Sequence, residues 1–338
     1  MPDQLLHTRE DLPAGLLDCP VEDLHTLLKG PTLIHLPGRR PEPLFVSVLL
    51  HGNEPVGMQA MQQVLKRYQG QELPRALSLF IGNVSAAARQ QRRLDGQPDY
   101  NRIWAEGQTP EHAMAAEVVA QMRQREVFAS IDVHNNTGLN PHYGCVNRLD
   151  HRFLRLATNF SRTVVYFTKP EGVQTSAFAD FCPAVTLECG QPEQAYGVKH
   201  AAEFLDTVLN MARLSDRQVP EHDIDLFHTV ALVKVPTEVS FGFDEAAGVD
   251  LCFEADLDHM NFRELTVGTV FGQVKAGAAV RLEAMDEQGE DRGAHYFSVE
   301  DGVLKINQAV MPSMLTLNEK VIRQDCLCYL MERLALPV

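Results

Sequence analysis

The sequence predicts an α/β/α sandwich built on a mostly parallel central sheet, followed by a smaller β domain. Apolar, strand-like runs alternate with amphipathic segments up to about residue 215, which is the pattern of a parallel sheet covered by helices. Beyond Pro220 the runs become short and β-like, and Gly, Asp and Glu separate them. We therefore expect one domain over residues 1–222 and a β-rich domain over residues 223–338.

The individual elements follow from hydrophobic periodicity. Continuous apolar runs predict strands at 32–36, 43–50, 77–81, 127–133, 163–167 and 184–189. Apolar residues at helical spacing, such as Ala115, Val118 and Met122, predict helices at 21–28, 58–68, 111–125, 148–158 and 198–213. Short β-like runs follow at 227–237, 268–274, 279–284, 294–299 and 303–306. Residues 82–106 have no clean periodicity, and a loop of this length inside a compact domain is usually functional or disordered.

Composition restricts the partners and the compartment. The 338 residues are 45% hydrophobic and 22% charged, as in a soluble globular protein, and apolar runs of about eight residues are too short to cross a membrane. The net charge of −15 argues against binding to nucleic acid. Seven cysteines without a CxxC pair, and residues 1–4 without a secretory signal, favour the cytoplasm.

One basic cluster interrupts this acidic chain. Arg89, Arg92, Arg93 and Arg102 lie within fourteen residues, inside the segment that lacks periodicity. Such a cluster predicts a site for a small anionic ligand, although a solvated basic loop is the commoner explanation.

His51 and Glu54 are the most informative residues of the chain. They follow the apolar strand at 43–50 and precede a helix that starts near Pro55. The carboxyl ends of parallel strands are where open α/β sheets bind their ligands, so this imidazole and carboxylate can converge on one cation. Taken alone, a His-x-x-Glu pair is often accidental.

A second strand end supplies another imidazole. The strand at 127–133 runs into Asp132-Val133-His134-Asn135-Asn136. Two His and one Glu make the three-ligand set of catalytic zinc, with a fourth position open for water. Asp132 would point to the same side as His134 and is interpreted either as its hydrogen-bond partner or as an ordinary polar residue at a sheet end.

Five segments together resemble the aspartoacylase and succinylglutamate desuccinylase family of the zinc carboxypeptidase clan. The segments are His51-Gly52-Asn53-Glu54, Asn101-Arg102-Ile103-Trp104, Asp132-Val133-His134-Asn135-Asn136-Thr137, Leu187-Glu188-Cys189-Gly190 and Leu315-Thr316-Leu317-Asn318-Glu319-Lys320-Val321-Ile322-Arg323. They occur in the order of the family and span nearly the whole chain. Each match is weak by itself, but the order makes the set specific.

The resemblance implies a fold of the zinc carboxypeptidase type and a set of roles. One Zn²⁺ per chain would be held by His51, Glu54 and His134. Glu188 would move the proton from the water to the leaving amine. The family role of a substrate-carboxylate clamp falls on Asn101 and Arg102. The oxyanion arginine would be Arg92, with Arg93 as its competitor, because two additional residues within 96–100 disturb the register.

The sequence also departs from the family. Residues 173–180 contain neither the Tyr nor the Arg that aspartoacylase carries before its catalytic glutamate, and Ala177 and Phe178 lie where a cation would be needed. The C-domain Tyr of the family would fall near Val303. Lys169 is the one nearby basic residue. The specificity pocket is therefore predicted to be more apolar than that of aspartoacylase.

These observations predict a cytoplasmic, zinc-dependent hydrolase that cleaves an amide bond in a small substrate with a free carboxylate. The preferred substrate is an N-acyl amino acid with a neutral or apolar side chain. A metallocarboxypeptidase acting on short peptides is the alternative, and a catalytically silent ligand-binding homologue is a further one that the complete ligand set and Glu188 argue against. No nucleic-acid or membrane partner is expected, and a homodimer is compatible with this hypothesis.

Overall fold

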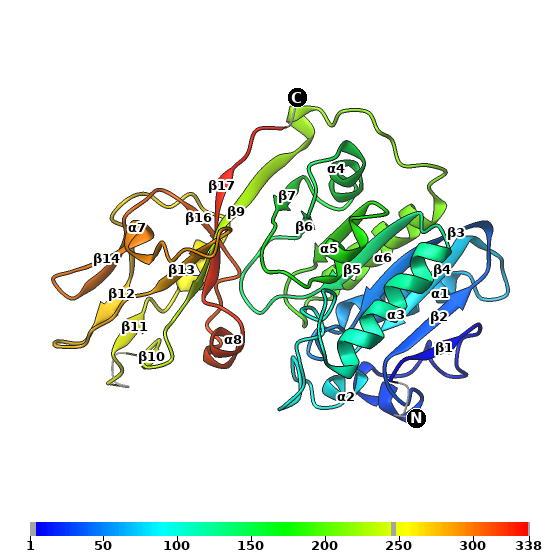
Figure 1. Cartoon of the computed structure of the whole chain (residues 1–338), viewed down its shortest axis with the longest axis horizontal. Coiled ribbons are helices and arrows are strands. Elements are labelled where there is room, and N and C mark those ends of the chain that lie inside the picture. The colour runs from blue at the N-terminus through cyan, green and yellow to red at the C-terminus, as the bar shows by residue number, and fades with distance from the viewer. Residues whose placement is uncertain (1–4, 245–247, 337–338) are drawn as a thin grey trace. The chain divides into compact units, whose positions relative to one another are not determined.

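A computed structural model of the chain describes residues 5–244 and 248–336, so residues 1–4, on which the expectation of no secretory signal partly rests, lie outside it. The chain divides into two compact units (Figure 1). In the described part, the first unit contains the residues up to Asn135 and His142–Asp225. The second contains Asn136–Pro141 and Leu226–Leu336.

The first unit is built on a mixed sheet with strand order β1-β2-β4-β3-β5-β8-β6-β7. The strands are β1 (His7–Arg9), β2 (Thr32–Leu36), β3 (Gly38–Val48), β4 (Leu73–Ile81), β5 (Ala129–His134), β6 (Tyr143–Val146), β7 (Thr163–Tyr166) and β8 (Ala184–Glu188). The central strands β4, β3, β5 and β8 are parallel, whereas β2 runs against β4 and β6 runs against β8. β3, β5 and β8 therefore end at the same edge of the sheet.

Helices cover both faces of this sheet. They are η1 (Val21–Thr26), α1 (Val56–Arg67), α2 (Val84–Ala87), α3 (Pro110–Gln124), α4 (His151–Thr158), α5 (Gln174–Phe178), α6 (Ala195–Asn210) and η2 (Glu221–Asp223). On one face α1 packs beside α6, and a Cβ at Gly57 would lie 2.9 Å from atoms of both Val48 and Val133. On the other face Phe178 of α5 stacks on Phe45 of β3. This is the three-layer arrangement that the alternating pattern predicts.

The second unit is rich in β structure. Its strands are β9 (Asp225–Lys234), β10 (Phe241–Gly242), β11 (Leu251–Phe253), β12 (Val270–Val274), β13 (Glu283–Asp286), β14 (Phe297–Glu300), β15 (Val303–Ile306), β16 (Met311–Ser313) and β17 (Cys328–Arg333). Its helices are η4 (Leu257–Met260), α7 (Gly293–Tyr296) and α8 (Glu319–Gln324). The order β10-β11-β12-β15-β14 forms one sheet, and β9 pairs with β17 and β13. Leu251, Phe271 and Leu304 belong to its buried core.

The segment 315–323, which had no evident chemical role in the sequence, has a structural one. Asn318 caps α8 by accepting a hydrogen bond from the backbone N–H of Val321. Arg323 donates a hydrogen bond to the carbonyl of Pro236 at 2.9 Å, and its guanidinium lies over the ring of Phe241. This tail therefore fastens α8 to the β structure of its own unit.

The predicted fold class is confirmed as a mixed α/β protein with a large central sheet. Five short elements of the first unit were not predicted, namely β1, α2, β6, α5 and η2. β6 is a four-residue strand inside a region that looked like a loop, and α5 spans only five residues, so neither is long enough to show a period. Among the described residues, no helix is long and apolar enough to cross a membrane.

Candidate metal centre

The turn after β3 brings two potential ligands to the edge of the sheet. β3 ends at Val48, and the chain turns through Leu49, whose φ is 55°, before it reaches His51. Gly52 is required in this turn, because a Cβ there would lie 2.3 Å from the backbone of Ala86. Helix α1 then starts at Val56, so Glu54 is held just before the first helical turn.

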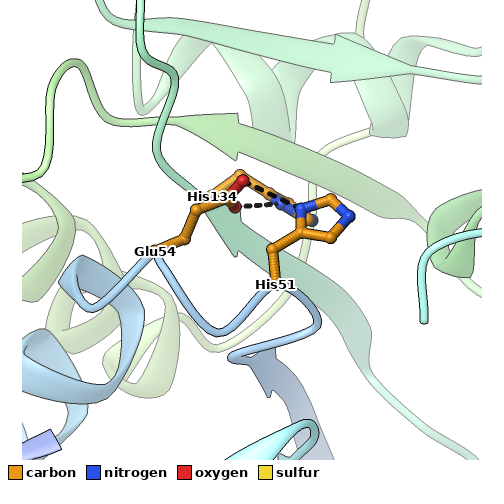
Figure 2. A group of neighbouring side chains, drawn as sticks. All are labelled: His51, Glu54 and His134. Atoms are coloured by element: carbon orange, nitrogen blue, oxygen red, sulfur yellow. Dashed lines mark hydrogen bonds and ion pairs between the residues drawn. The ribbon is translucent and has the colours of Figure 1, made fainter. Parts of the chain in front are cut away.

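His51, Glu54 and His134 form a buried group that could hold a metal ion (Figure 2). Nδ1 of His51 lies 2.8 Å from Oε1 of Glu54, and Nδ1 of His134 lies 2.7 Å from Oε2 of the same carboxylate. One potential ligand atom from each residue lies within 4.8 Å of the others. Zinc bonds to nitrogen and carboxylate oxygen are about 2.0–2.2 Å long, so small side-chain shifts would place all three atoms on one ion.

Each imidazole has a second carboxylate at its other nitrogen. Nε2 of His134 lies 2.6 Å from Oδ2 of Asp132, and Nε2 of His51 lies 2.9 Å from Oδ1 of Asp99. The hydroxyl of Ser47 donates to Oδ1 of Asp132 and holds this carboxylate beside Nε2 of His134. A proton kept on Nε2 leaves the Nδ1 lone pair free for a cation, which is the usual arrangement of metal-binding histidines.

Opposing charges shift the protonation of this group. Burial and Arg92 lower the pKa of His51, but the carboxylates of Glu54 and Asp99 outweigh them and the pKa is raised. Burial likewise lowers the pKa of His134, yet Asp132 and Glu54 hold that pKa well above its ordinary value. For Glu54, burial raises the pKa, and the two imidazoles more than reverse this, so that the pKa is strongly lowered. In the absence of an ion the group thus favours protons on its imidazoles.

Formal charges show why a divalent cation fits here. With both imidazoles neutral, the four carboxylates Glu54, Asp99, Asp132 and Glu188 and the two guanidinium groups of Arg92 and Arg102 leave a formal charge of −2 around the site. Buried charge is costly unless it is paired. A doubly charged ion at the two Nδ1 atoms and Glu54 would supply that pairing.

Glu188 lies directly beside His134 on the neighbouring strand. β5 and β8 are parallel, and their register pairs these two residues directly. Paired residues place their side chains on the same face of a sheet, so the Glu188 carboxyl is a neighbour of the His134 imidazole. The Glu188 side chain is buried, and the backbone N–H of Cys189 donates to the carbonyl of His134. Sequence analysis predicted Glu188 for this position.

Of the basic cluster in the segment without periodicity, Arg92 lies beside the metal group, whereas Arg93 points away from it. Arg92 donates two hydrogen bonds to Oδ2 of Asp99, at 3.1 and 2.9 Å, and its Nη1 lies 3.9 Å from Oε1 of Glu54. Arg93 instead donates to the backbone carbonyl of Gln97 at 2.7 Å. Of the two candidates for the oxyanion arginine, Arg92 is therefore the one beside the metal group.

Asn101 and Arg102 lie in the same loop but have different hydrogen-bond partners. The carboxamide of Asn101 accepts a hydrogen bond from the backbone N–H of Gln174, and its Nδ2 lies 3.3 Å from Nε2 of His134. The guanidinium of Arg102 donates one hydrogen bond to the backbone carbonyl of Asn101 and remains half-buried. Asn101 thus fastens the loop to the start of α5 and lies against the His134 ring, and the half-buried Arg102 follows it in the same loop.

The prediction that Phe178 lines the specificity pocket is wrong. Phe178 is completely buried, with its ring 4.4 Å from that of Phe45 and in edge contact with Trp104, so it belongs to the core under α5. Its face of α5 packs on the sheet, and the short run gave no period from which this could be read. Lys169, the one basic residue that could have supplied a cation, is exposed and paired with Glu171.

Two residues that organise the site were not predicted from the sequence. Asp99 was not predicted because it lies in a segment without periodicity, although the sequence shows an acid two residues before Asn101. Asn135 links three segments: its Oδ1 accepts from the N–H of Val56 at the start of α1, and its Nδ2 donates to the carbonyl of Gly190. Asn135 lies in the segment 132–137 that resembles the family, but the two hydrogen bonds that give it this role could not be predicted from the sequence.

Comparisons with known proteins agree with this arrangement. The family model described as the succinylglutamate desuccinylase/aspartoacylase catalytic domain matches residues 43–215. No curated protein sequence matches the chain. Among solved structures, succinylglutamate desuccinylase from Chromobacterium violaceum is 16% identical with a TM-score of 0.57, and the match covers 88% of this chain and 87% of that one. Murine aminoacylase 3 is 14% identical with a TM-score of 0.55, covering 88% and 96%. A product-bound ectoine utilization protein from Ruegeria pomeroyi is 11% identical with a TM-score of 0.55, covering 90% and 88%.

The fold and the buried His-Glu-His group define an α/β protein with a potential metal centre at the carboxyl edge of its sheet. The family match extends over half of the chain and includes every residue of this centre. The chain belongs to the succinylglutamate desuccinylase/aspartoacylase family, whose members are hydrolases acting on amide bonds.

Proposed function

We propose that the protein is a zinc-dependent hydrolase of N-acyl amino acids, with a preference for neutral or apolar amino acid side chains. The observation that carries this proposal is the position of Glu188 directly beside His134, in register across β5 and β8. It supports the proposal because a buried carboxyl lies on the same face of the sheet as the potential metal centre, in the neighbouring strand. A divalent ion bound there would supply Lewis-acid polarisation of the scissile carbonyl and a water of lowered pKa.

Proton transfer, stabilisation of the oxyanion and binding of the substrate carboxylate are assigned to side chains of this chain. Glu188 takes the proton of the attacking water and delivers it to the leaving amine. Arg92, held by Asp99 next to Glu54, faces the place where negative charge develops on the carbonyl oxygen. Arg102 binds the substrate carboxylate through its forked guanidinium. Asn101 keeps that loop in place against Gln174 and His134.

The carboxylate contact gives a direct test of the substrate class. Arg102→Lys keeps the charge but removes the planar fork, so we expect kcat/KM on an N-acyl amino acid to fall at least tenfold. Arg93→Lys is the matched control, because Arg93 serves its own loop and its replacement should change kcat/KM by less than twofold. Steady-state kinetics on the acid and on its primary amide check the assignment. Equal hydrolysis of acid and amide by the wild type would remove Arg102 from the role of carboxylate receptor.

The amino acid preference is a separate prediction. N-acetylmethionine should be hydrolysed at least ten times more efficiently than N-acetylaspartate, because an unpaired carboxylate costs several kcal/mol on burial. α5 carries no basic residue, and Lys169 is engaged with Glu171 at the surface. Competition between the two substrates in one reaction measures the ratio. Preference for the aspartate compound would show that a cation reaches the side-chain site. Cleavage of short peptides in place of both compounds would favour the carboxypeptidase alternative.

A further inference from the structure

Asn135 directly follows His134, and its buried side chain bonds to two other segments of the first unit. β5 ends at His134, and the last backbone hydrogen bond between β5 and the chain of β8 runs from the N–H of Cys189 to the carbonyl of His134, at 3.0 Å. Nδ2 of Asn135 then donates to the carbonyl of Gly190 at 2.9 Å. The Asn135 side chain therefore extends the attachment of β8 by one further hydrogen bond beyond Glu188.

The turn that follows Glu188 is closely packed. Gly190 has a φ of 76°, which favours glycine, and a Cβ there would lie 3.0 Å from the side chain of Gln194. Gly197 of α6 packs against the carbonyl of Cys189, because a Cβ at position 197 would lie 2.4 Å from that oxygen. A displacement at the Gly190 carbonyl is therefore expected to be taken up by the strand end that carries Glu188.

The other amide atom of Asn135 bonds to the segment that carries Glu54. α1 begins at Val56, and its N-cap residue Pro55 provides no side-chain hydrogen bond to the helix. The first N–H groups of a helix have no partner within the helix. Oδ1 of Asn135 accepts from the N–H of Val56 at 3.2 Å and so caps α1 from a neighbouring strand. The backbone N–H of Asn135 also donates to Oε2 of Glu54 at 3.4 Å.

We infer that Asn135 is a positioning residue that fixes Glu188 relative to the potential metal ligands. This inference rests on the proposed function, in which Glu188 moves the proton. A proton-transfer group must lie within hydrogen-bond reach of the water that it activates, so a small displacement of its strand end lowers the rate. The two amide atoms have separate tasks: Oδ1 supports the turn after Glu54, and Nδ2 supports the strand end with Glu188.

Asn135→Asp keeps an oxygen for the N–H of Val56 and removes the donor to Gly190. It should bind Zn²⁺ at least as tightly as the wild type in a competition with a chelator, because a carboxylate at the start of α1 is stabilised by the helix. Its kcat on N-acetylmethionine should fall at least tenfold, with KM within threefold. Amide hydrogen exchange in a peptide covering residues 187–191 should become at least fivefold faster. Asn135→Ala lacks both atoms, so its Zn²⁺ affinity should also fall at least fivefold.

Gly190→Ala perturbs the same contact from the other end and gives a readout if the Asn135 variants do not fold. It should lower kcat and speed the exchange of residues 187–191 without weakening Zn²⁺ binding. Combining Asn135→Asp with Gly190→Ala should lower kcat by less than the product of the two single losses, because both changes act on one contact.

Asn147→Asp is the matched control. Nδ2 of Asn147 also donates to a backbone carbonyl, that of Phe167, at 3.1 Å. β6 runs against β8 and pairs Cys145 with Thr186, so Asn147 lies toward the end of β8 opposite to Glu188. This variant should keep kcat, Zn²⁺ affinity and the same exchange rate within twofold of the wild type.

A folded, Zn²⁺-loaded Asn135→Asp variant with kcat and exchange at the wild-type level would overturn this inference. A parallel loss of kcat, Zn²⁺ affinity and melting temperature in both Asn135 variants would overturn it too, because such a residue serves folding only. Failure of the Zn²⁺-loaded wild type to hydrolyse any N-acyl amino acid would overturn the proposed function instead, because exchange rate and Zn²⁺ affinity report on Asn135 without a substrate.

Discussion

Glu188→Gln is expected to leave the protein folded and loaded with metal and to lower kcat by about two to four orders of magnitude. The amide has nearly the shape of the carboxyl but cannot accept the proton of the attacking water. Because Glu188 is paired with His134 through the strands and is not one of the three potential ligands, its replacement should spare metal binding.

Glu193→Gln is a suitable control for Glu188→Gln. Glu193 lies in the loop after β8 and is exposed, so the same chemical change there should leave kcat within twofold. Single-turnover kinetics separate the chemical step from substrate binding. Activity of Glu188→Gln near the wild-type level would return this carboxyl to the role of an ordinary buried strand terminus.

Loss of the metal centre is the second large effect that we expect. His134→Ala removes one ligand and also leaves Asp132 buried without its imidazole, so the variant should bind metal weakly and lose activity by at least about three orders of magnitude. The melting temperature should fall as well, because an unpaired carboxylate remains in the interior.

His35→Ala separates this effect from the general cost of removing a buried histidine. His35 is buried on β2, where its ring contacts Ser78 and Gln121 and no residue of the metal group. The variant should lose stability but keep its metal and its turnover number. If His35→Ala and His134→Ala lose activity to the same extent, the loss reflects folding and not the metal centre.

Much of the site could be predicted because its residues stand at the ends of apolar strands. His51, His134 and Glu188 each follow a run whose length and composition predict a buried strand, and parallel strands end at one edge of a sheet. The convergence of these residues is therefore a consequence of topology, which the alternating pattern already indicates.

The remainder of the site depends on tertiary contacts that leave no periodic signal. Asp99 lies in an irregular loop, and its pairing with His51 spans 48 positions of sequence. α5 is too short to show which of its faces is buried, so Phe178 was assigned to the substrate pocket when it in fact packs on Phe45. β6 was missed for the same reason, and with it the neighbours of Glu188 on that side.

Metal analysis of protein purified without chelators tests whether His51, Glu54 and His134 hold an ion. We expect about one zinc-type divalent ion per wild-type chain and almost none in a folded His134→Ala variant, with His35→Ala indistinguishable from the wild type. A wild-type protein free of metal would rule out this metal centre. Unchanged metal content in His134→Ala would rule it out equally, because the ion would then be held somewhere other than at His51, Glu54 and His134.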